Sequence, residues 1–240
     1  MTFTLPYERK GFSQHGETGI IEILLQGIHT PRKNFLEIGL GVGFENMSYD
    51  LLEKGYNGIG VDPRPWNETW TRRYPELLTK IQSFVNPQNV VQMLTEHGLE
   101  KETDFFSLDI DSYDYVVAEA LINWGFRPAV VCVEINRYFA NDVVASFPYV
   151  EIPIKKVYKR KYFGGVSLKK WKNFWQANNY TFFTLNHNDV NAFFYDSSQC
   201  TVDSTLPVIE NVRSVVNDEE IKNAIMNDYI FSSFIDEIYK

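Results

Sequence analysis

Cysteine is scarce in this sequence, which has two among 240 residues. Cys132 lies in an apolar stretch and Cys200 in a polar one, so together they form neither a disulfide framework nor the paired spacing of a zinc site. The sequence also lacks an apolar run long enough to cross a bilayer, and it lacks the apolar N-terminal core of a signal peptide. We therefore expect a soluble, cytoplasmic protein without a membrane span.

Positive charge is also in short supply. Lys and Arg number 23 against 31 Asp and Glu, which gives a formal net charge of −8. Because general nucleic-acid binding depends on clustered positive charge, we expect no nucleic-acid partner. A length of 240 residues suits a single domain with a substantial core, and no internal repeat or interdomain linker divides it.

A glycine-rich turn stands out between two predicted strands within residues 34–62. The first strand spans 35–38 and the second ends at Asp62. The turn between them carries three alternate glycines: Gly39, Gly41 and Gly43. Glycine allows positive φ angles and a close approach of backbone to ligand, and Asp62 can accept hydrogen bonds from a ribose diol. The pattern predicts a nucleoside-binding βαβ unit; a glycine turn without a ligand is the alternative.

The rest of the sequence continues the alternation of strands and helices. Further strands are predicted at 79–85, 104–110, 129–134, 180–186 and 191–197. Helices are predicted at 17–26, from Pro87, from a cap at Ser112 to Gly125, and from a cap at Ser167. The last two strands are so close in sequence that they must form an antiparallel hairpin. A capping box at Asn217 and Glu220 predicts a helix in the tail.

This pattern predicts an α/β fold of the Rossmann-like, doubly wound type. We expect a mostly parallel seven-stranded sheet with a C-terminal antiparallel β-hairpin and a helical C-terminal tail. Dinucleotide enzymes and methyltransferases both begin this way. A pyrophosphate site favours G-x-G-x-x-G, whereas Phe44 occupies the place of its third glycine here. The terminal hairpin is also unusual for a dinucleotide fold, although an NAD-dependent oxidoreductase stays a rival interpretation.

Several short motifs carry a family resemblance. They are SQHGE at 13–17, E-x-G-x-G-x-G at 37–43, DIDSYDY at 109–115, VEIN at 133–136 and NAFF at 191–194. With these motifs, residues 13–197 resemble the class I S-adenosylmethionine-dependent methyltransferases, and more narrowly the FkbM-like and macrocin-type sugar O-methyltransferases. The resemblance implies that S-adenosylmethionine contacts Gln14, Glu37, Gly39, Gly41, Gly43, Asn46, Asp62, Phe84 and Asp109. Phe84 is also explained as a core residue at the end of a strand.

Acidic residues end two neighbouring predicted strands. Asp109 ends one strand, and Glu134 and Asn136 follow the next. Because parallel strands bring their carboxyl ends to one edge, these oxygen ligands suit Mg²⁺ or Mn²⁺. The metal-dependent O-methyltransferases similar to this chain hold their ion with acids at these two strand ends. The alternative is that Asp109 and Asp111 only cap the following helix.

A sugar hydroxyl needs activation before it can accept a methyl group. Coordination to a divalent ion stabilises the developing alkoxide, and a neighbouring base takes the proton. Together with Asp109, the candidate catalytic residues are Asp111, Asp114 and His187. His187 is also explained as a solvated turn residue. A catalytically silent methyltransferase-like module, which binds a glycan or a partner chain, is a second rival.

Residues 137–166 lack a clear helix and are rich in aromatic and basic side chains. Arg137, Tyr138, Tyr158 and Tyr162 can stack on a pyranose ring. The basic run at 155–161 could bind a phosphate, a nucleotide-sugar or an acidic glycan, or it could be a solvated loop. We therefore expect a carbohydrate substrate that is free, nucleotide-linked or polymeric.

The chain is interpreted as one methyltransferase domain over residues 1–240. Its parts are an N-terminal helical cap (1–30), a cofactor-binding half (31–136), a substrate-recognition insertion (137–166), a helix plus hairpin (167–197) and a helical extension (198–240). The apolar residues at 230–238 could pack on this body or on a second subunit of a homo-oligomer.

Overall fold

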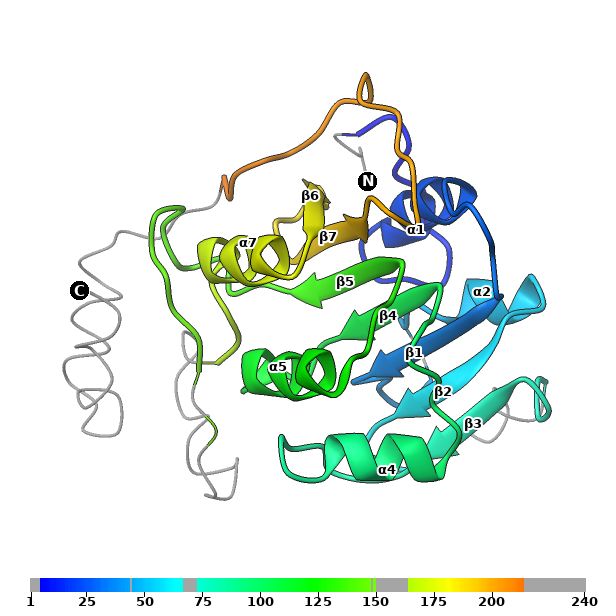
Figure 1. Ribbon diagram of the computed structural model, residues 1–240. Coiled ribbons are helices and arrows are strands. Elements are labelled where there is room, and N and C mark those ends of the chain that lie inside the picture. Colours follow the sequence, from blue (N-terminus) through cyan, green and yellow to red (C-terminus); the bar gives the residue numbers. More distant parts are fainter. Residues whose placement is uncertain (1–4, 44, 67–72, 148, 150–163, 214–240) are drawn as a thin grey trace.

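The computed structural model describes residues 5–43, 45–66, 73–147, 149 and 164–213. Within them, a seven-stranded sheet has the order β3-β2-β1-β4-β5-β7-β6 (Figure 1). The strands are β1 (Asn34–Ile38), β2 (Asn57–Val61), β3 (Leu78–Ile81), β4 (Phe105–Leu108), β5 (Val130–Glu134), β6 (Tyr180–Leu185) and β7 (Asn191–Asp196). The first five are parallel, and β7 lies antiparallel between β5 and β6. The predicted sheet and its terminal hairpin are confirmed.

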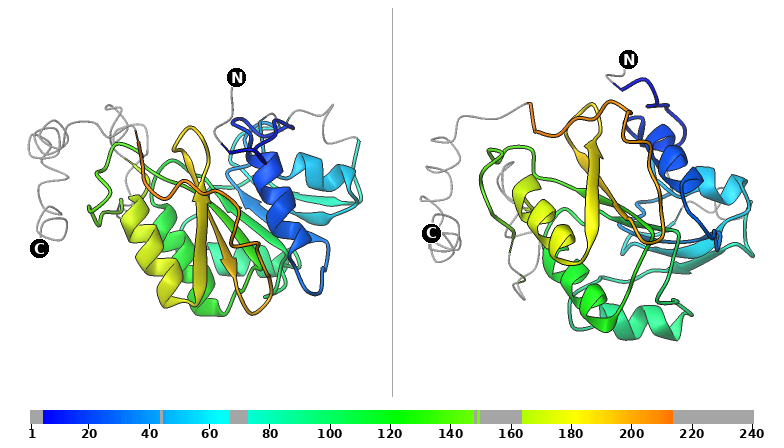
Figure 2. Two further views of the ribbon diagram at one scale, coloured as in Figure 1. Left: turned by 90° about the horizontal axis from the view of Figure 1, so that it is seen from above. Right: turned by 45° about the horizontal axis from the view of Figure 1, so that its top comes forward.

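Helices cover both faces of the sheet (Figures 1 and 2). One face carries α4 (Val90–Glu96), α5 (Asp114–Trp124) and α7 (Leu168–Ala177), and the other carries α1 (Glu17–Gln26) and α2 (Tyr49–Glu53). Successive side chains of a strand alternate between the faces. In β1, Leu36 and Ile38 accordingly pack with the first group of helices and Phe35 with the second. Both faces are therefore apolar, as a doubly wound sheet requires.

The strand register brings the predicted metal ligands Asp109 and Glu134 to one edge of the sheet. Leu108 of β4 pairs with Val133 of β5, so the residues that follow them, Asp109 and Glu134, are neighbours. Because β7 runs in the opposite direction, its first residue, Asn191, pairs with Glu134. The turn between β6 and β7 therefore lies at the same edge as the carboxyl ends of β1 to β5.

The segment between β3 and α4 differs from the sequence prediction. Strand β3 ends at Ile81 rather than at residue 85, and α4 begins at Val90 rather than near Pro87. The Asn86 side chain accepts hydrogen bonds from the backbone N–H groups of the two residues before Val90. Because of this local turn, α4 begins at Val90, and residues 82–89 form a loop.

The start of α5 also differs from the prediction, because Ser112 is not its cap. The helix begins at Asp114, and the Ser112 hydroxyl instead donates to the carbonyl of Ile110. The Asp114 carboxylate accepts the N–H groups of Ile110 and Ser112 and closes the turn. At α7 the prediction is confirmed, since the Ser167 hydroxyl accepts the N–H of Lys170.

The C-terminal part of the chain is described only as far as residue 213. Residues 198–213 contain turns and extended segments, and the Ile209 carbonyl accepts the N–H of Leu185 in β6. The predicted tail helix from Asn217 and the apolar residues 230–238 lie outside the described residues. In the part of the chain that the structure describes, no helix is both long and apolar enough to cross a bilayer.

Gly39 offers a direct test of the packing between β1 and β4. Its φ angle is 92°, and a Cβ there would lie 1.6 Å from the carbonyl oxygen of Asp109. At Gly98 the φ angle is 85°, yet a Cβ would meet no described heavy atom within 4 Å. Replacing either glycine by alanine strains the backbone by about 1–2 kcal/mol. Only Gly39→Ala adds a collision with main chain, which cannot move aside cheaply.

We expect Gly98→Ala to lower the free energy of unfolding by about 1 kcal/mol. For Gly39→Ala the expected loss is on the order of 3 kcal/mol or more, because overpacking adds to the strain. Urea denaturation followed by circular dichroism measures both. Equal losses in the two variants would mean that Gly39 is not a point of close approach.

Candidate functional site

A cavity of about 410 Å³ opens at the carboxyl ends of the first four strands. Its lining includes Gly39 after β1, Asp62 and Arg64 after β2, Phe84 after β3 and residues 109–113 after β4. The strand order reverses between β1 and β4, which is where doubly wound folds bind their ligands. The volume falls in the range of small-molecule sites. This cavity is therefore the candidate functional site.

The glycine turn adopts the backbone that its sequence predicts. Gly39, Gly41 and Gly43 all have positive φ angles, of 92°, 71° and 95°. The N–H of Gly39 donates to the carbonyl of Val61 in β2 over 2.9 Å. The N–H of Gly41 donates to the Asp62 carboxylate over 2.7 Å. Both bonds tie the turn to the carboxyl end of β2.

Asp62 is a buried carboxylate whose two oxygens accept four hydrogen bonds. It is 2% exposed, and besides Gly41 its donors are the backbone N–H, Nε and Nη2 of Arg64, at 2.9, 2.9 and 3.0 Å. Burial raises the pKa of Asp62, but the hydrogen bonds from Arg64 and Gly41 outweigh it, so the pKa lies below its ordinary value. Asp62 is therefore ionised at neutral pH. Sequence reasoning missed Arg64, although it lies only two residues beyond Asp62.

Phe84 lies in the loop after β3, where its ring is 65% exposed and lines the cavity. The interpretation of Phe84 as a core residue at a strand end is therefore wrong. Tyr113, which sequence reasoning also missed, donates its hydroxyl hydrogen to the carbonyl of Val85 over 2.7 Å. This bond ties the loop that carries Phe84 to the start of α5. An exposed ring on a cavity wall can stack on a flat ligand.

Glu37 points to the face of the sheet that α1 and α2 cover. Its two oxygens accept the N–H groups of Met47 and Ser48, both over 2.9 Å. Burial raises the pKa of Glu37 to about 7. Glu37 is thus placed to hold the segment that enters α2, and within the described residues it is not part of the cavity lining.

Two further predicted cofactor residues surround the same segment. The Asn46 side-chain oxygen accepts the N–H of Tyr49, while its Nδ2 is buried without a hydrogen-bond partner among the described atoms. Gln14 donates from Nε2 to Glu45 over 3.5 Å, which connects the N-terminal segment to the residues after the glycine turn. The buried amide of Asn46 is therefore a polar group that a ligand could satisfy.

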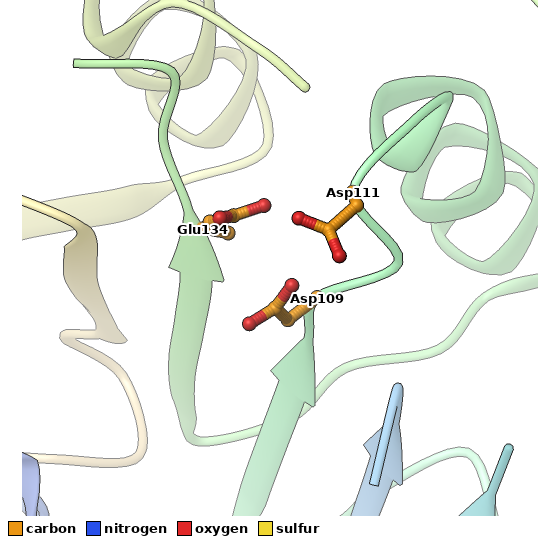
Figure 3. A group of neighbouring side chains, drawn as sticks. All are labelled: Asp109, Asp111 and Glu134. Carbon is orange, nitrogen blue, oxygen red and sulfur yellow. The ribbon is translucent and has the colours of Figure 1, made fainter. Parts of the chain in front are cut away.

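Three carboxylates meet at the ends of β4 and β5 (Figure 3). Oxygens of Asp109, Asp111 and Glu134 lie within 4.8 Å of one another. Burial, and then the charge of Asp111, raise the pKa of Asp109 to about 8. Burial and the charge of Asp109 likewise raise the pKa of Glu134 well above its ordinary value. A group of three crowded carboxylates, of which Asp109 and Glu134 are partly buried and Asp111 is exposed, fits a hard divalent cation such as Mg²⁺ or Mn²⁺.

The sequence predicted Asn136, not Asp111, beside the other two acids. In the structure, the Asn136 amide donates to the carbonyl of Gly164 and its oxygen accepts the N–H of Tyr138. Its side chain therefore holds the loop after β5, and the structure places Asp111 in the acidic group in its stead. Asp111 reaches this position with a φ angle of 58°, which is rare for a residue other than glycine.

The other two candidate bases are held by hydrogen bonds of their own. Asp114 is fully buried, and burial raises its pKa to about 6. Because both of its oxygens accept backbone N–H groups, Asp114 has a structural role in the turn before α5. The His187 side chain is 9% exposed, with Nδ1 3.1 Å from Glu8. The interpretation of His187 as a solvated turn residue is therefore wrong.

The predicted substrate residues are described only in part. Arg137 donates from Nη1 to the carbonyl of Asn188 over 3.2 Å, and its guanidinium lies 5.7 Å from the centre of the Tyr138 ring. Both residues lie in the segment after β5, three and four residues beyond Glu134. Tyr158, Tyr162 and the basic run at 155–161 lie outside the described residues.

Comparisons with known proteins give similarity of fold at low sequence identity. No protein-family model and no curated protein matches the sequence. A Klebsiella pneumoniae protein provisionally described as an O-methyltransferase is 12% identical, with 80% of this chain and 83% of that chain covered and a TM-score of 0.47. The Burkholderia thailandensis 1,6-didemethyltoxoflavin-N1-methyltransferase, solved with S-adenosylhomocysteine, is 12% identical over 68% and 70%, with a TM-score of 0.45. An O-methyltransferase family 2 protein from Planctomyces limnophilus, solved with apigenin, is 14% identical over 74% and 56%, with a TM-score of 0.41.

At these identities and scores the similarity assigns neither an activity nor a substrate. The function has to be inferred from the residues of the site.

The raised pKa of Glu37 predicts a specific dependence of stability on pH. Its ordinary value is 4.5 and its value in the folded protein is about 7, so the folded state binds this proton more tightly. The resulting stabilisation is complete below pH 4.5 and is lost as the pH rises through 7. The loss is on the order of 3 kcal/mol for a shift of this size.

In Glu37→Gln this contribution is absent, because the amide does not titrate. We expect the free energy of unfolding of the unsubstituted protein to fall more steeply between pH 5 and pH 8 than that of the variant. Urea denaturation at several pH values measures both curves. Parallel curves would contradict the raised pKa, whereas a constant offset reflects only the changed hydrogen bonds to Met47 and Ser48.

Proposed function

We propose that this protein is an S-adenosylmethionine-dependent O-methyltransferase that acts on a sugar hydroxyl of a glycan or a glycosylated metabolite, with the help of Mg²⁺ or Mn²⁺. The position of Asp109 carries the proposal. Its side chain belongs to the acidic group, and the same residue lines the cavity that begins at the glycine turn. A nucleoside donor in the cavity and a cation on the acids would therefore be adjacent.

The cavity offers a matching surface for each part of the proposed cofactor. Asp62 is ionised and suits a ribose diol, and the exposed ring of Phe84 suits the adenine. Gly39 exposes backbone where a methionine moiety would lie. The motif E-x-G-x-G-x-G at 37–43, rather than G-x-G-x-x-G, favours this cofactor over a nicotinamide dinucleotide.

The acidic group would hold the cation through Asp109 and Glu134, with Asp111 beside them. A bound divalent ion would supply the Lewis acid that stabilises a developing alkoxide. Asp111 is exposed and lines the cavity, so it is the best placed of the candidate bases to accept a proton from an entering alcohol. The indole N–H of Trp171 donates to the Glu134 carbonyl over 2.9 Å and fixes the end of β5.

The sugar class is supported by the residues that follow β5 and by the resemblance of the motifs. Arg137 and Tyr138 form a cation–aromatic pair next to the acidic group in sequence, and such a pair can stack on a pyranose ring. We propose residues 137–166 as the substrate-recognition insertion. Both cysteines are buried and unpaired, which supports a reducing, cytoplasmic compartment.

The cofactor proposal is tested by calorimetric titration with S-adenosylhomocysteine. We expect binding by the unsubstituted protein and about tenfold or greater weakening in Asp62→Ala, because a charged acceptor of the ribose hydroxyls is lost. Asp203→Ala is the matched control, since Asp203 accepts hydrogen bonds from Thr205 in a loop and does not line the cavity. Absence of heat with S-adenosylhomocysteine, together with binding of NADH, would replace the proposal by the oxidoreductase interpretation.

The metal proposal is tested by Mn²⁺ binding, followed by electron paramagnetic resonance. We expect Glu134→Gln and Asp109→Asn each to weaken Mn²⁺ binding by more than the roughly 10–100-fold that loss of a residue hydrogen-bonded to a metal ligand typically costs. Glu134→Gln should still bind S-adenosylhomocysteine, because Glu134 does not line the cavity. Unchanged Mn²⁺ affinity in both variants would remove the metal from the proposal and leave the cofactor in place.

A further inference from the structure

We infer that Arg64 is an affinity-determining residue of the cofactor site: its guanidinium occupies the face of Asp62 that the ribose diol would use and must leave before the nucleoside binds. The inference rests on the proposed function, because it concerns the same cavity. It concerns a residue that neither the motifs nor the comparisons single out.

The hydrogen bonds of Asp62 leave little room for a further donor. A carboxylate offers about four lone-pair sites. Two are filled by backbone N–H groups, from Gly41 to Oδ2 and from Arg64 to Oδ1. The guanidinium fills the other two, with Nε on Oδ1 and Nη2 on Oδ2. A ribose diol, which donates one hydrogen bond to each oxygen, would need the two sites that the guanidinium holds.

The two kinds of donor differ in how easily they can be displaced. The backbone groups are fixed by the turn after β1 and by the chain after β2. The Arg64 side chain is 61% exposed, whereas its partner Asp62 is 2% exposed. The guanidinium can therefore rotate into water at small cost. The buried Asp62 carboxylate has no comparable access to water, so it needs another hydrogen-bond donor when the guanidinium leaves. In the empty cavity Arg64 solvates a buried charge, and in the filled cavity the ribose hydroxyls take over this role.

The negative charges around Arg64 extend beyond Asp62. The hydrogen bonds to Asp62 contribute most to the raised pKa of Arg64, and the nearby charge of Asp111 raises it further. A guanidinium released from Asp62 would still lie near Asp111, so its release does not strand a cation in an apolar place. Arg64 and Asp111 both line the cavity, which keeps the released side chain within the site.

Because the Arg64 guanidinium competes with the ribose for Asp62, removing the arginine side chain should strengthen nucleoside binding and not weaken it. We expect Arg64→Met to bind S-adenosylhomocysteine about fivefold more tightly than the unsubstituted protein, which corresponds to the upper end of the range for ion pairs with an exposed member. Arg64→Lys keeps the charge but loses the two-pronged geometry, so its affinity should lie between the two. Calorimetric titration with S-adenosylhomocysteine measures all three.

Arg32→Met is the matched control for the change in net charge. Arg32 pairs with Glu102 and does not line the cavity, so its loss should leave the affinity for S-adenosylhomocysteine unchanged. Thermal melting checks that each variant is folded, and Arg64→Lys serves as the test if Arg64→Met does not fold.

The outcomes separate this inference from the cofactor proposal. If the unsubstituted protein binds S-adenosylhomocysteine and the Arg64 variants bind it equally or more weakly, the guanidinium is a ligand contact or a bystander, and the inference is overturned while the cofactor proposal stands. If neither the unsubstituted protein nor Arg64→Met binds S-adenosylhomocysteine, both are overturned.

Discussion

The site depends on the close approach of the chain after β1 to the chain after β4, where the order of the strands in the sheet reverses. Gly39 leaves β1 with no Cβ, and the carbonyl of Asp109 occupies the space that a Cβ would take. This contact sets the position of the chain after β4, and with it the position of the Asp109 carboxylate. The parallel register between β4 and β5 then places Glu134 beside it. The absence of a side chain at Gly39 thus allows the cavity and the acidic group to share one edge of the sheet.

The electrostatics of this edge follow from an excess of buried acids. Asp62 is stabilised by Arg64 and by backbone N–H groups, so its pKa is lowered. Burial and then the charge of Asp111 raise the pKa of Asp109, and burial and then the charge of Asp109 raise the pKa of Glu134. Asp62 and Asp109, which both line the cavity, thus have pKa values shifted in opposite directions because only Asp62 is surrounded by strong hydrogen-bond donors. Ligand hydroxyls that replace the Arg64 guanidinium would keep Asp62 hydrogen-bonded, and a cation on Asp109 would relieve the crowding of the other acids.

The mostly parallel sheet, its terminal hairpin and the meeting of Asp109 with Glu134 could be predicted from the sequence, because hydrophobic runs locate parallel strands and such strands share an edge. The third member of the acidic group could not be predicted, because side-chain hydrogen bonds decide between Asn136 and Asp111. Asn136 forms hydrogen bonds with Gly164 and Tyr138, and Asp111 lies beside the other two acids. Ser112 failed as a cap because the Asp114 carboxylate closes the turn. A hydrophobic pattern does not predict which of several polar side chains will form a hydrogen bond with a given backbone group.

The central claim is that a nucleoside donor and an oxygen-ligated cation lie side by side at the carboxyl edge of the sheet. A crystal structure of the protein grown with S-adenosylhomocysteine and Mn²⁺, with anomalous scattering to locate manganese, tests it most directly. The account predicts the ribose on Asp62 and a manganese peak on Asp109 and Glu134. A cavity over the glycine turn that holds no nucleoside, or manganese bound away from these acids, would contradict it.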